Sequence, residues 1–340
     1  MGLSSAASGA RILNMPTIHI KHLEIVTLDD AGTIHHDADL VITDSKITHI
    51  GSPPADLRAD EVIDGNGRAA MPGFFNAHCH SPMTFERGWA EDLPFPRWLN
   101  EKIWVAESAL TPDDVHWGAA LAACEMIRSG TVGFNDHYFY MDRVAEVATR
   151  SGMKAALAWC VFGIGAQAEV GPGLAGTVDW IKATHGSSEG RIRTFLGPHS
   201  PYICPPEFLE QVVEVAQQTG QGIHLHLAES AEQVEQSIQR HGLTPVQQVA
   251  RLGVFDAPGG CVAAHALSID DEDTALLAEK GVHVAHCPIT YMKLAMPFPP
   301  LTDRLAAGVK VCLGTAGQQF RYGYVRHHPA NGADGQVSGK

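Results

Sequence analysis

The chain has 340 residues, of which 45% are hydrophobic and 18% are charged, so it is long enough to bury a large core. Its 38 acidic and 24 basic residues give a formal net charge of -14, which argues against nucleic acid or another polyanion as the partner. No run of about 18 apolar residues occurs, which argues against a membrane-spanning protein.

The start of the chain predicts no folded element. Residues 1–16 are rich in Gly, Ser and Ala and lack the apolar core of a secretion signal, so we expect a disordered leader. Seven scattered cysteines without a CxxC pair are typical of reduced thiols. These features together predict a cytoplasmic protein.

Residues 17–70 contain short runs rich in β-forming residues, separated by turn signals. The clearest runs are 18–27, 38–42 and 46–50, and a turn signal at 29–32 follows the first of them. This pattern predicts a small antiparallel sheet, which we interpret as part of a β-sandwich domain that is incomplete in this chain.

From residue 71 the pattern changes to apolar strands that alternate with longer helical stretches. A helix start is indicated where Thr111 precedes Pro112 and two aspartates. A doubly wound open sheet is disfavoured because no Gly-x-Gly-x-x-Gly turn follows a strand. We therefore predict an α/β protein with a (β/α)8 TIM-type barrel at 71–316, because eight strand-like runs begin near Met71, Thr131, Lys154, Arg193, Gly222, Gly260, Gly281 and Val309.

Histidines gather at the ends of the predicted barrel strands. His78 and His80 have the i, i+2 spacing that places two side chains on one face of a strand, where both can bind one metal ion. Four later strand-like runs also end in histidine, and packing does not explain such a set; these residues are His199, His224 with His226 and Glu229, His265, and His283 with His286. The spacing alone does not choose between His224 and His226 as a ligand.

These motifs resemble the metal-dependent amidohydrolase superfamily, within it the branch of methylthioadenosine/S-adenosylhomocysteine deaminases, guanine-type deaminases and triazine chlorohydrolases. The resemblance covers about residues 18–315, and its matching segments are 72–84, 87–94, 197–202, 226–229, 263–265 and 313–315. It implies that His78, His80 and His226 bind one divalent metal ion, zinc or alternatively iron, in the mouth of the barrel. Such an ion lowers the pKa of a bound water molecule and makes hydroxide available for attack.

The resemblance also implies roles for the neighbouring polar residues. Glu229 would move the proton from water to the substrate and His265 would stabilise the attacking hydroxide. Glu107 matches a carboxylate that binds ribose hydroxyls, and His199 matches a substrate contact. From the residues alone, a solvated acid is the better account of Glu107, and His199 fits a loop residue that satisfies carbonyl groups. His286 is expected to be structural or on the substrate side.

The implied function is hydrolytic deamination of an aminated heterocycle, with release of ammonia. The resemblance favours an adenosine-type small molecule, methylthioadenosine or S-adenosylhomocysteine, as the substrate. A non-catalytic metal-binding remnant and a triazine or guanine-type amidohydrolase are the alternatives. A homo-oligomer is compatible with these features.

The chain departs from the family pattern at the end of the eighth strand. The family places a metal-binding Asp after Gly-Thr, and here Ala316 follows Gly314 and Thr315. Residues 317–340 then lack a helical period. We interpret this tail as aberrant, the product of a frameshift or a truncation that removes the last barrel helix, and we expect an impaired and unstable enzyme. Sequencing the gene beyond codon 316 tests this hypothesis.

Overall fold

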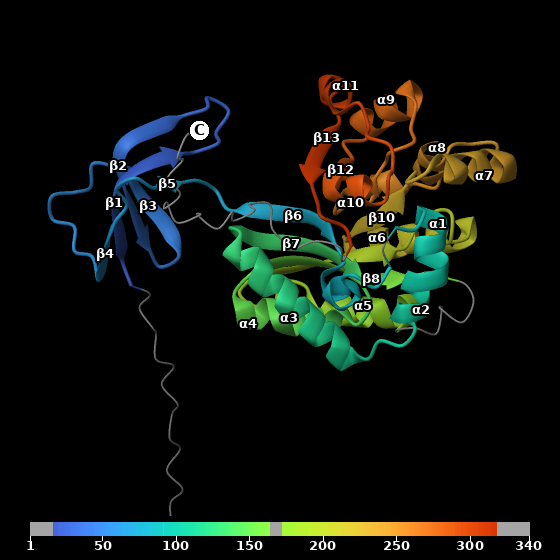
Figure 1. The fold of residues 1–340 in the computed structure, drawn as a ribbon, viewed down its shortest axis with the longest axis horizontal. Helices are drawn as coiled ribbons and strands as arrows, with labels where there is room; N and C mark the ends of the chain where they lie inside the picture. Colours follow the sequence, from blue (N-terminus) through green and yellow to red (C-terminus); the bar gives the residue numbers. More distant parts are fainter. Residues whose placement is uncertain (1–15, 91, 164–171, 318–340) are drawn as a thin grey trace, which may run out of the picture. The chain divides into compact units, whose positions relative to one another are not determined.

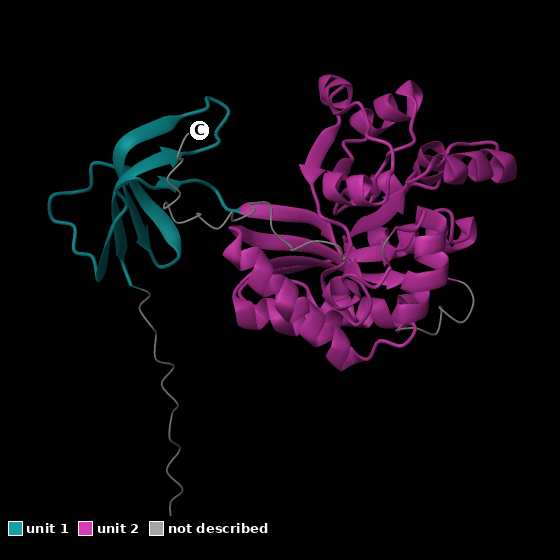
Figure 2. Ribbon diagram, viewed as in Figure 1, with its two compact units in different colours: residues 1–73 teal, residues 74–340 magenta. Residues whose placement is uncertain are grey.

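The computed structural model describes residues 16–90, 92–163 and 172–317. The chain divides into two compact units, residues 1–73 and residues 74–340 (Figure 2). The predicted boundary at residue 70 lies three residues before this division. Residues 1–15 of the predicted leader, and all but the first residue of the predicted tail at 317–340, lie outside the described residues.

The first unit contains a five-stranded sheet in which β1 is central (Figure 1). Its strands are β1 (Ile18–Val26), β2 (Ile34–Thr43), β3 (Lys46–Gly51), β4 (Glu61–Asp64) and β5 (Ala69–Ala70). The pairs β1–β2 and β2–β3 are antiparallel as predicted, but β4 and β5 both pair with β1 in parallel. The purely antiparallel sheet was therefore a wrong prediction. The reason is that the chain after β3 crosses back to the free edge of β1, and a crossover produces parallel pairing.

The second unit contains eight strands that pair in parallel in sequence order, which confirms the predicted barrel. They are β6 (Phe74–Cys79), β7 (Thr131–Tyr138), β8 (Lys154–Val161), β9 (Ile192–Pro198), β10 (Gly222–Leu227), β11 (Cys261–His265), β12 (His283–His286) and β13 (Lys310–Leu313). The first strand and the segment after the last strand meet through a parallel bridge between Cys79 and Ala316 and through backbone hydrogen bonds to His78. The ring is thus nearly closed, and the point of closure lies beside the predicted metal site.

Helices connect the barrel strands and cover their outer side (Figure 1). The longest are α3 (Pro112–Arg128), α4 (Met141–Ser151), α5 (Gly173–Thr184), α6 (Pro206–Thr219), α7 (Ala231–His241), α8 (Pro245–Arg251) and α9 (Asp271–Glu279). The predicted start of α3 is confirmed, because the Thr111 side chain accepts a hydrogen bond from the Asp114 amide in a reciprocal capping box. Shorter elements are η1 (Ser81–Glu86), α1 (Phe95–Arg97), η2 (Trp98–Ile103), α2 (Trp104–Glu107), η4 (Val254–Asp256), α10 (Pro288–Lys293) and α11 (Leu301–Ala306).

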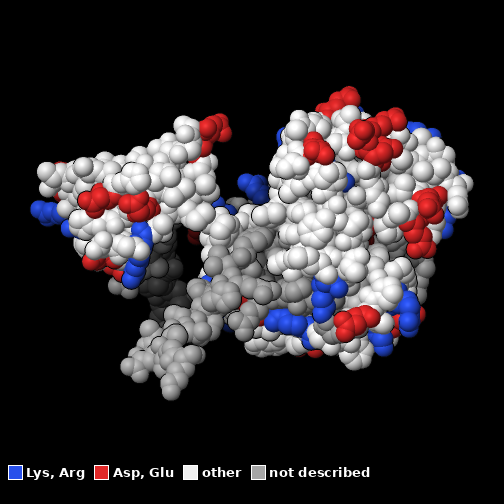
Figure 3. All heavy atoms as spheres, turned by 45° about the horizontal axis from the view of Figure 1, so that its top comes forward, with Lys and Arg blue, Asp and Glu red and all other residues white. Residues whose placement is uncertain are grey.

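Apolar side chains fill the space between strands and helices. Leu157 on β8, Leu196 on β9 and Ile223 on β10 are fully buried, as are Leu209 and Val212 on α6. On the face drawn in Figure 3, acidic and basic side chains lie in small separate groups. Among the described residues, no helix combines the length and the apolar composition that crossing a membrane requires.

Candidate metal centre and active site

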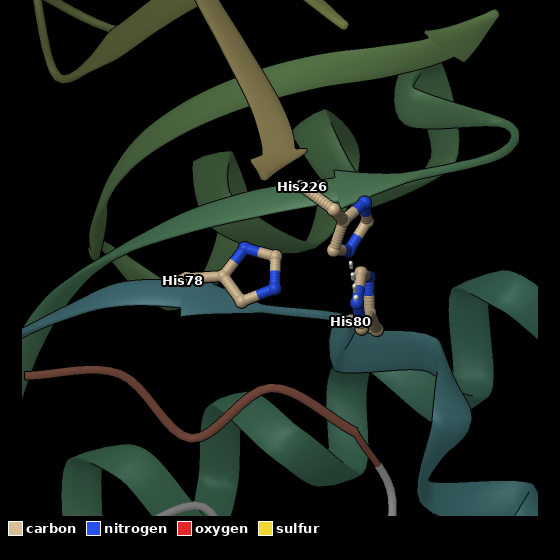
Figure 4. A group of neighbouring side chains, drawn as sticks. All are labelled: His78, His80 and His226. Carbon is tan, nitrogen blue, oxygen red and sulfur yellow. Dashed lines mark hydrogen bonds between the residues drawn. The ribbon is translucent and has the colours of Figure 1, made fainter. Parts of the chain in front are cut away.

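Three histidines converge at the mouth of the barrel, as the sequence predicted. His78 lies on β6, His80 directly follows its end, and His226 lies on β10 (Figure 4). One ring nitrogen from each residue lies within 4.8 Å of the other two. His78 and His226 are buried and His80 is half-buried. The alternation of side chains along a strand explains why His78 and His80 share one face.

Hydrogen bonds to carbonyl groups orient two of these rings. Nδ1 of His80 lies 2.6 Å from the carbonyl oxygen of His137, and Nδ1 of His226 lies 2.9 Å from that of His199. Because a carbonyl only accepts, each Nδ1 must carry a proton, and in the neutral ring Nε2 then presents a lone pair. The two Nε2 atoms lie 3.3 Å apart. Two lone pairs at this distance repel each other unless a cation lies between them.

The three rings are neutral at physiological pH. Burial lowers the pKa of His80 to about 3, with a further contribution from His226, and burial lowers the pKa of His226 to about 4. The pKa of His78 is lowered well below its ordinary value, first by burial and then by His80. Neutral imidazole is the form that binds metal ions. The donor set, its tautomers and its protonation therefore fit a divalent cation.

A buried acid and a buried histidine lie next to this cluster. Oε1 of Glu229 is 3.3 Å from Nε2 of His265, and Nδ1 of His265 is 3.4 Å from the Tyr291 hydroxyl. Burial raises the pKa of Glu229 to about 8, although hydrogen bonds from Gln233 and Tyr202 oppose this change. Burial also keeps His265 neutral, because it lowers the pKa of that ring well below its ordinary value. A carboxyl group that titrates near neutrality is suited to proton transfer.

Glu107 and His199, the predicted substrate contacts, line the same pocket, whose open volume is about 630 Å³. Glu107 comes from α2, where it is half-buried, and burial raises its pKa to about 8 despite a hydrogen bond with Tyr138. This environment argues against Glu107 as a fully solvated acid. His199 is 8% exposed, and its carbonyl oxygen accepts hydrogen bonds from both the amide and Nδ1 of His226. The backbone of His199 therefore orients a predicted ligand, while its ring faces the pocket.

Sequence reasoning missed the contribution of β7. His137 lines the pocket, its carbonyl orients His80, and its ring centre lies 5.1 Å from that of His226. Next to it, the Asp136 carboxylate accepts hydrogen bonds from the amide and the hydroxyl of Ser81, which anchors the start of η1. The histidine at the end of the second barrel strand was the signal that could have identified this side chain. His286, by contrast, packs beside Tyr291 and Phe298, away from the three-histidine cluster.

Ala316 lies where the family pattern predicts an aspartate. Its side chain lines the pocket and is 3% exposed. Its amide donates to the His78 carbonyl at 3.0 Å, and its carbonyl accepts from the His80 amide at 3.2 Å. Gly314 permits this approach, since a Cβ atom there would lie 2.8 Å from the same His78 carbonyl. The backbone is thus placed to direct a ligand at the cluster, but the side chain is a methyl group.

The fold and the site together define a class. A (β/α)8 barrel that gathers three neutral imidazoles and a buried Glu–His pair at the carboxyl ends of its strands is a hydrolase barrel with a metal-binding mouth.

Comparison with known proteins identifies the family. Residues 69–337 match the Amidohydrolase family, and this chain belongs to that family of hydrolases, which act on carbon–nitrogen bonds. A 5-methylthioadenosine/S-adenosylhomocysteine deaminase of Pelotomaculum thermopropionicum is 40% identical over 89% of this chain and 70% of its own length. The deaminase of the same name from Moorella thermoacetica is 44% identical with the same coverage. A third, from Dictyoglomus thermophilum, is 47% identical over 76% of this chain and 60% of its own length.

Solved structures agree on the fold. A zinc-bound adenosine deaminase from Xanthomonas campestris superposes with a TM-score of 0.81, at 29% identity over 90% of this chain and 70% of that protein. An atrazine chlorohydrolase from Arthrobacter aurescens, complexed with zinc, gives a TM-score of 0.79 at 24% identity, over 90% of this chain and 73% of that protein. At that identity the second likeness supports the fold alone.

Proposed function

We propose that this chain carries the site of a metal-dependent hydrolytic deaminase that acts on an adenosine-type heterocycle, methylthioadenosine or S-adenosylhomocysteine, and that this site lacks one carboxylate ligand. The observation that carries the proposal is the convergence of His78, His80 and His226 beside the Glu229–His265 pair in one pocket. The names and identities of the curated relatives support the substrate class.

His78, His80 and His226 would hold the ion, for which we propose zinc, with iron as the alternative. When bound, the ion would supply a Lewis acid that lowers the pKa of a water molecule and, through its charge, that of Glu229. Glu229 accepts one proton from the attacking water and delivers it to the ring nitrogen. It then transfers a second proton, from the hydroxyl now bonded to the attacked carbon, to the departing amine, and the carbon–nitrogen bond breaks as ammonia leaves. His265, held between Glu229 and Tyr291, orients the attacking oxygen by a hydrogen bond.

Other residues that line the pocket suit a nucleoside. Glu107 reaches the pocket from α2 and offers carboxyl oxygens that accept hydrogen bonds from two ribose hydroxyls. His199 and Phe162 both line the pocket and stack with their ring centres 5.2 Å apart, which provides an aromatic surface for a heterocycle.

A second candidate is a protein of the same lineage that binds metal without turnover. The position of Ala316 favours it, because a buried methyl group replaces the expected carboxylate beside His78 and His80. Removing one member of a catalytic unit costs several orders of magnitude in rate. The two candidates share the metal site and differ only in turnover.

Metal analysis combined with an ammonia-release assay distinguishes the active deaminase from the protein that binds metal without turnover. The assay uses adenosine, methylthioadenosine, S-adenosylhomocysteine, guanine and a chlorinated triazine, with Glu229→Gln as the control. Ammonia release from an adenosine-type substrate that disappears in the control supports the deaminase. Bound metal without release from any substrate supports the remnant, and release from guanine or hydrolysis of the triazine alone would reassign the substrate.

A further inference from the structure

His224 is a fully buried histidine that the proposed mechanism does not use. It lies two residues before His226 on the inward face of β10, and sequence spacing made both residues candidate ligands. The structure separates them. His226 directs Nε2 at His80, whereas Nε2 of His224 lies 2.9 Å from Nδ1 of His78.

We propose that His224 is a positioning residue for the metal site: its Nε2 accepts a hydrogen bond from the Nδ1–H of His78 and so holds His78 in the tautomer whose Nε2 lone pair faces His80 and His226. This inference rests on the proposed metal site and adds a residue to it. Metal-binding histidines ordinarily donate their second N–H to a fixed acceptor, which sets both tautomer and ring orientation.

The depth of His78 in the barrel explains why the acceptor is a side chain. His80 and His226 donate to carbonyls at the ends of β7 and β9. His78 lies one pleat deeper, within β6, and its side chain is fully buried in the barrel interior. There Nε2 of the inward-facing His224 on β10 lies within hydrogen-bond distance of Nδ1 of His78.

The direction of this hydrogen bond follows from the other ring nitrogens. Nε2 of His78 is buried and has no hydrogen-bond partner among the described residues. If His224 were the donor, Nε2 of His78 would carry the proton of that ring and would be unable to coordinate a metal ion. With His78 as donor, the same nitrogen presents the third lone pair of the site.

His137 offers the next partner in the chain of rings. When Nε2 of His224 accepts, its Nδ1 carries a proton, and this atom has no partner in the described part of the chain. Nε2 of His137 is also buried without a partner there, and the two ring centres lie 5.1 Å apart. A direct or water-bridged hydrogen bond between them would satisfy both atoms.

The first test reads the tautomer itself. The full chain is labelled with nitrogen-15 histidine and measured by long-range proton–nitrogen NMR. The signals of His78 are assigned as those that disappear in His78→Gln. We expect His78 to carry its proton on Nδ1 and none on Nε2. His224→Gln keeps an acceptor and should preserve this state, whereas His224→Phe should lose it. The matched control is His116→Phe, which makes the same replacement at another buried histidine, on α3. A proton on Nε2 of His78 in the unsubstituted chain overturns the inference.

The second test measures affinity for zinc alone by competition with a chelating dye. We expect His224→Phe to weaken zinc binding about 10- to 100-fold, His224→Gln to weaken it less, and His116→Phe to leave it unchanged. If the His224→Phe variant binds zinc as tightly as the unsubstituted chain, the inference is overturned. If zinc does not bind the unsubstituted chain, the proposed metal site fails, and the NMR result still decides the role of His224.

Discussion

At the residue scale, position 316 determines how complete the proposed metal site is. Its backbone is held by hydrogen bonds to His78 and His80, and its φ of 53° lies in the left-handed region, as do those of Ala228 and His265 at two other strand ends. Alanine is strained in this region, and such strain is common where a fold supports a functional site. Aspartate tolerates the same conformation better than alanine does.

Ala316→Asp should therefore restore a ligand without disturbing the backbone. We expect tighter zinc binding, by about tenfold or more, and an increase in ammonia release from the best substrate, because a carboxylate would complete the donor set. Zinc competition and the ammonia assay measure both effects. Ala316→Asn is the control, since it fits the conformation but brings no charge. An equal effect of both substitutions would contradict the role assigned to the carboxylate.

Glu86 is a second residue whose environment predicts a measurable effect. It is 4% exposed, and neither carboxyl oxygen has a hydrogen-bond partner among the residues that the structure describes. Burial, followed by the charge of Glu107, raises its pKa to about 9. Because the folded chain binds this proton more tightly than the unfolded chain, in which the pKa is near 4.5, the free energy of unfolding falls as the pH rises from about 4.5 toward 9.

Glu86→Met should thus increase the free energy of unfolding at pH 8 by about 1–3 kcal/mol, because it removes an unsatisfied buried polar group of similar length. Urea unfolding at pH 5 and pH 8 should show a smaller loss of stability with pH in the variant than in the parent chain. Glu125→Met, which removes the half-buried carboxylate that pairs with Arg87, is the comparison for a carboxylate that has a partner. A variant less stable than the parent at pH 8 would show that Glu86 has a stabilising partner.

At the element scale, the sequence predicted those features that local patterns specify. Eight apolar runs that end in polar residues became the barrel strands, and the histidines at their ends came together because carboxyl ends of parallel strands meet at one face. The parallel pairing of β4 with β1 was not predictable, because it depends on a crossover that no alternation pattern records. The His78–His224 contact also escaped, since strand spacing gives the face of a residue but not its partner across the barrel.

The start of α3 allows a direct test of one local signal. Thr111→Ala removes the hydroxyl that accepts from the Asp114 amide and so leaves a helix amide without a partner. We expect a loss of about 1 kcal/mol in the free energy of unfolding, measured by urea denaturation. Thr302→Ala changes an exposed threonine that caps no helix and should have a much smaller effect. Equal losses would show that the capping box does not stabilise the barrel.

At the scale of the whole barrel, the proposed metal site links strands that are far apart in the sheet. His78 lies on the first strand, β6, and His80 directly follows it, whereas His226 lies on β10, which three strands separate from β6 in the sheet order. The bridge between Cys79 and Ala316 closes the ring nearby, together with the hydrogen bonds from the Thr315 and Ala316 amides to the His78 carbonyl. A cation bound by these histidines would add a direct link between β6 and β10, which the His78–His224 hydrogen bond also connects.

Zinc should consequently raise the thermal stability of the chain, and chelation should reverse the rise. A ligand that binds only the folded state at 100 times its dissociation constant adds about 2.7 kcal/mol to the free energy of unfolding. His226→Ala should abolish the increase, while His116→Ala should retain it. Binding to the folded chain should persist to about pH 5, because the pKa values of His80 and His226, about 3 and 4, keep both rings neutral there. Thermal unfolding with zinc or chelator from pH 5 to pH 8 measures this dependence. If the zinc-dependent increase disappears between pH 7 and pH 6, histidines with ordinary pKa values bind the ion instead, and the cation belongs to a different, exposed site.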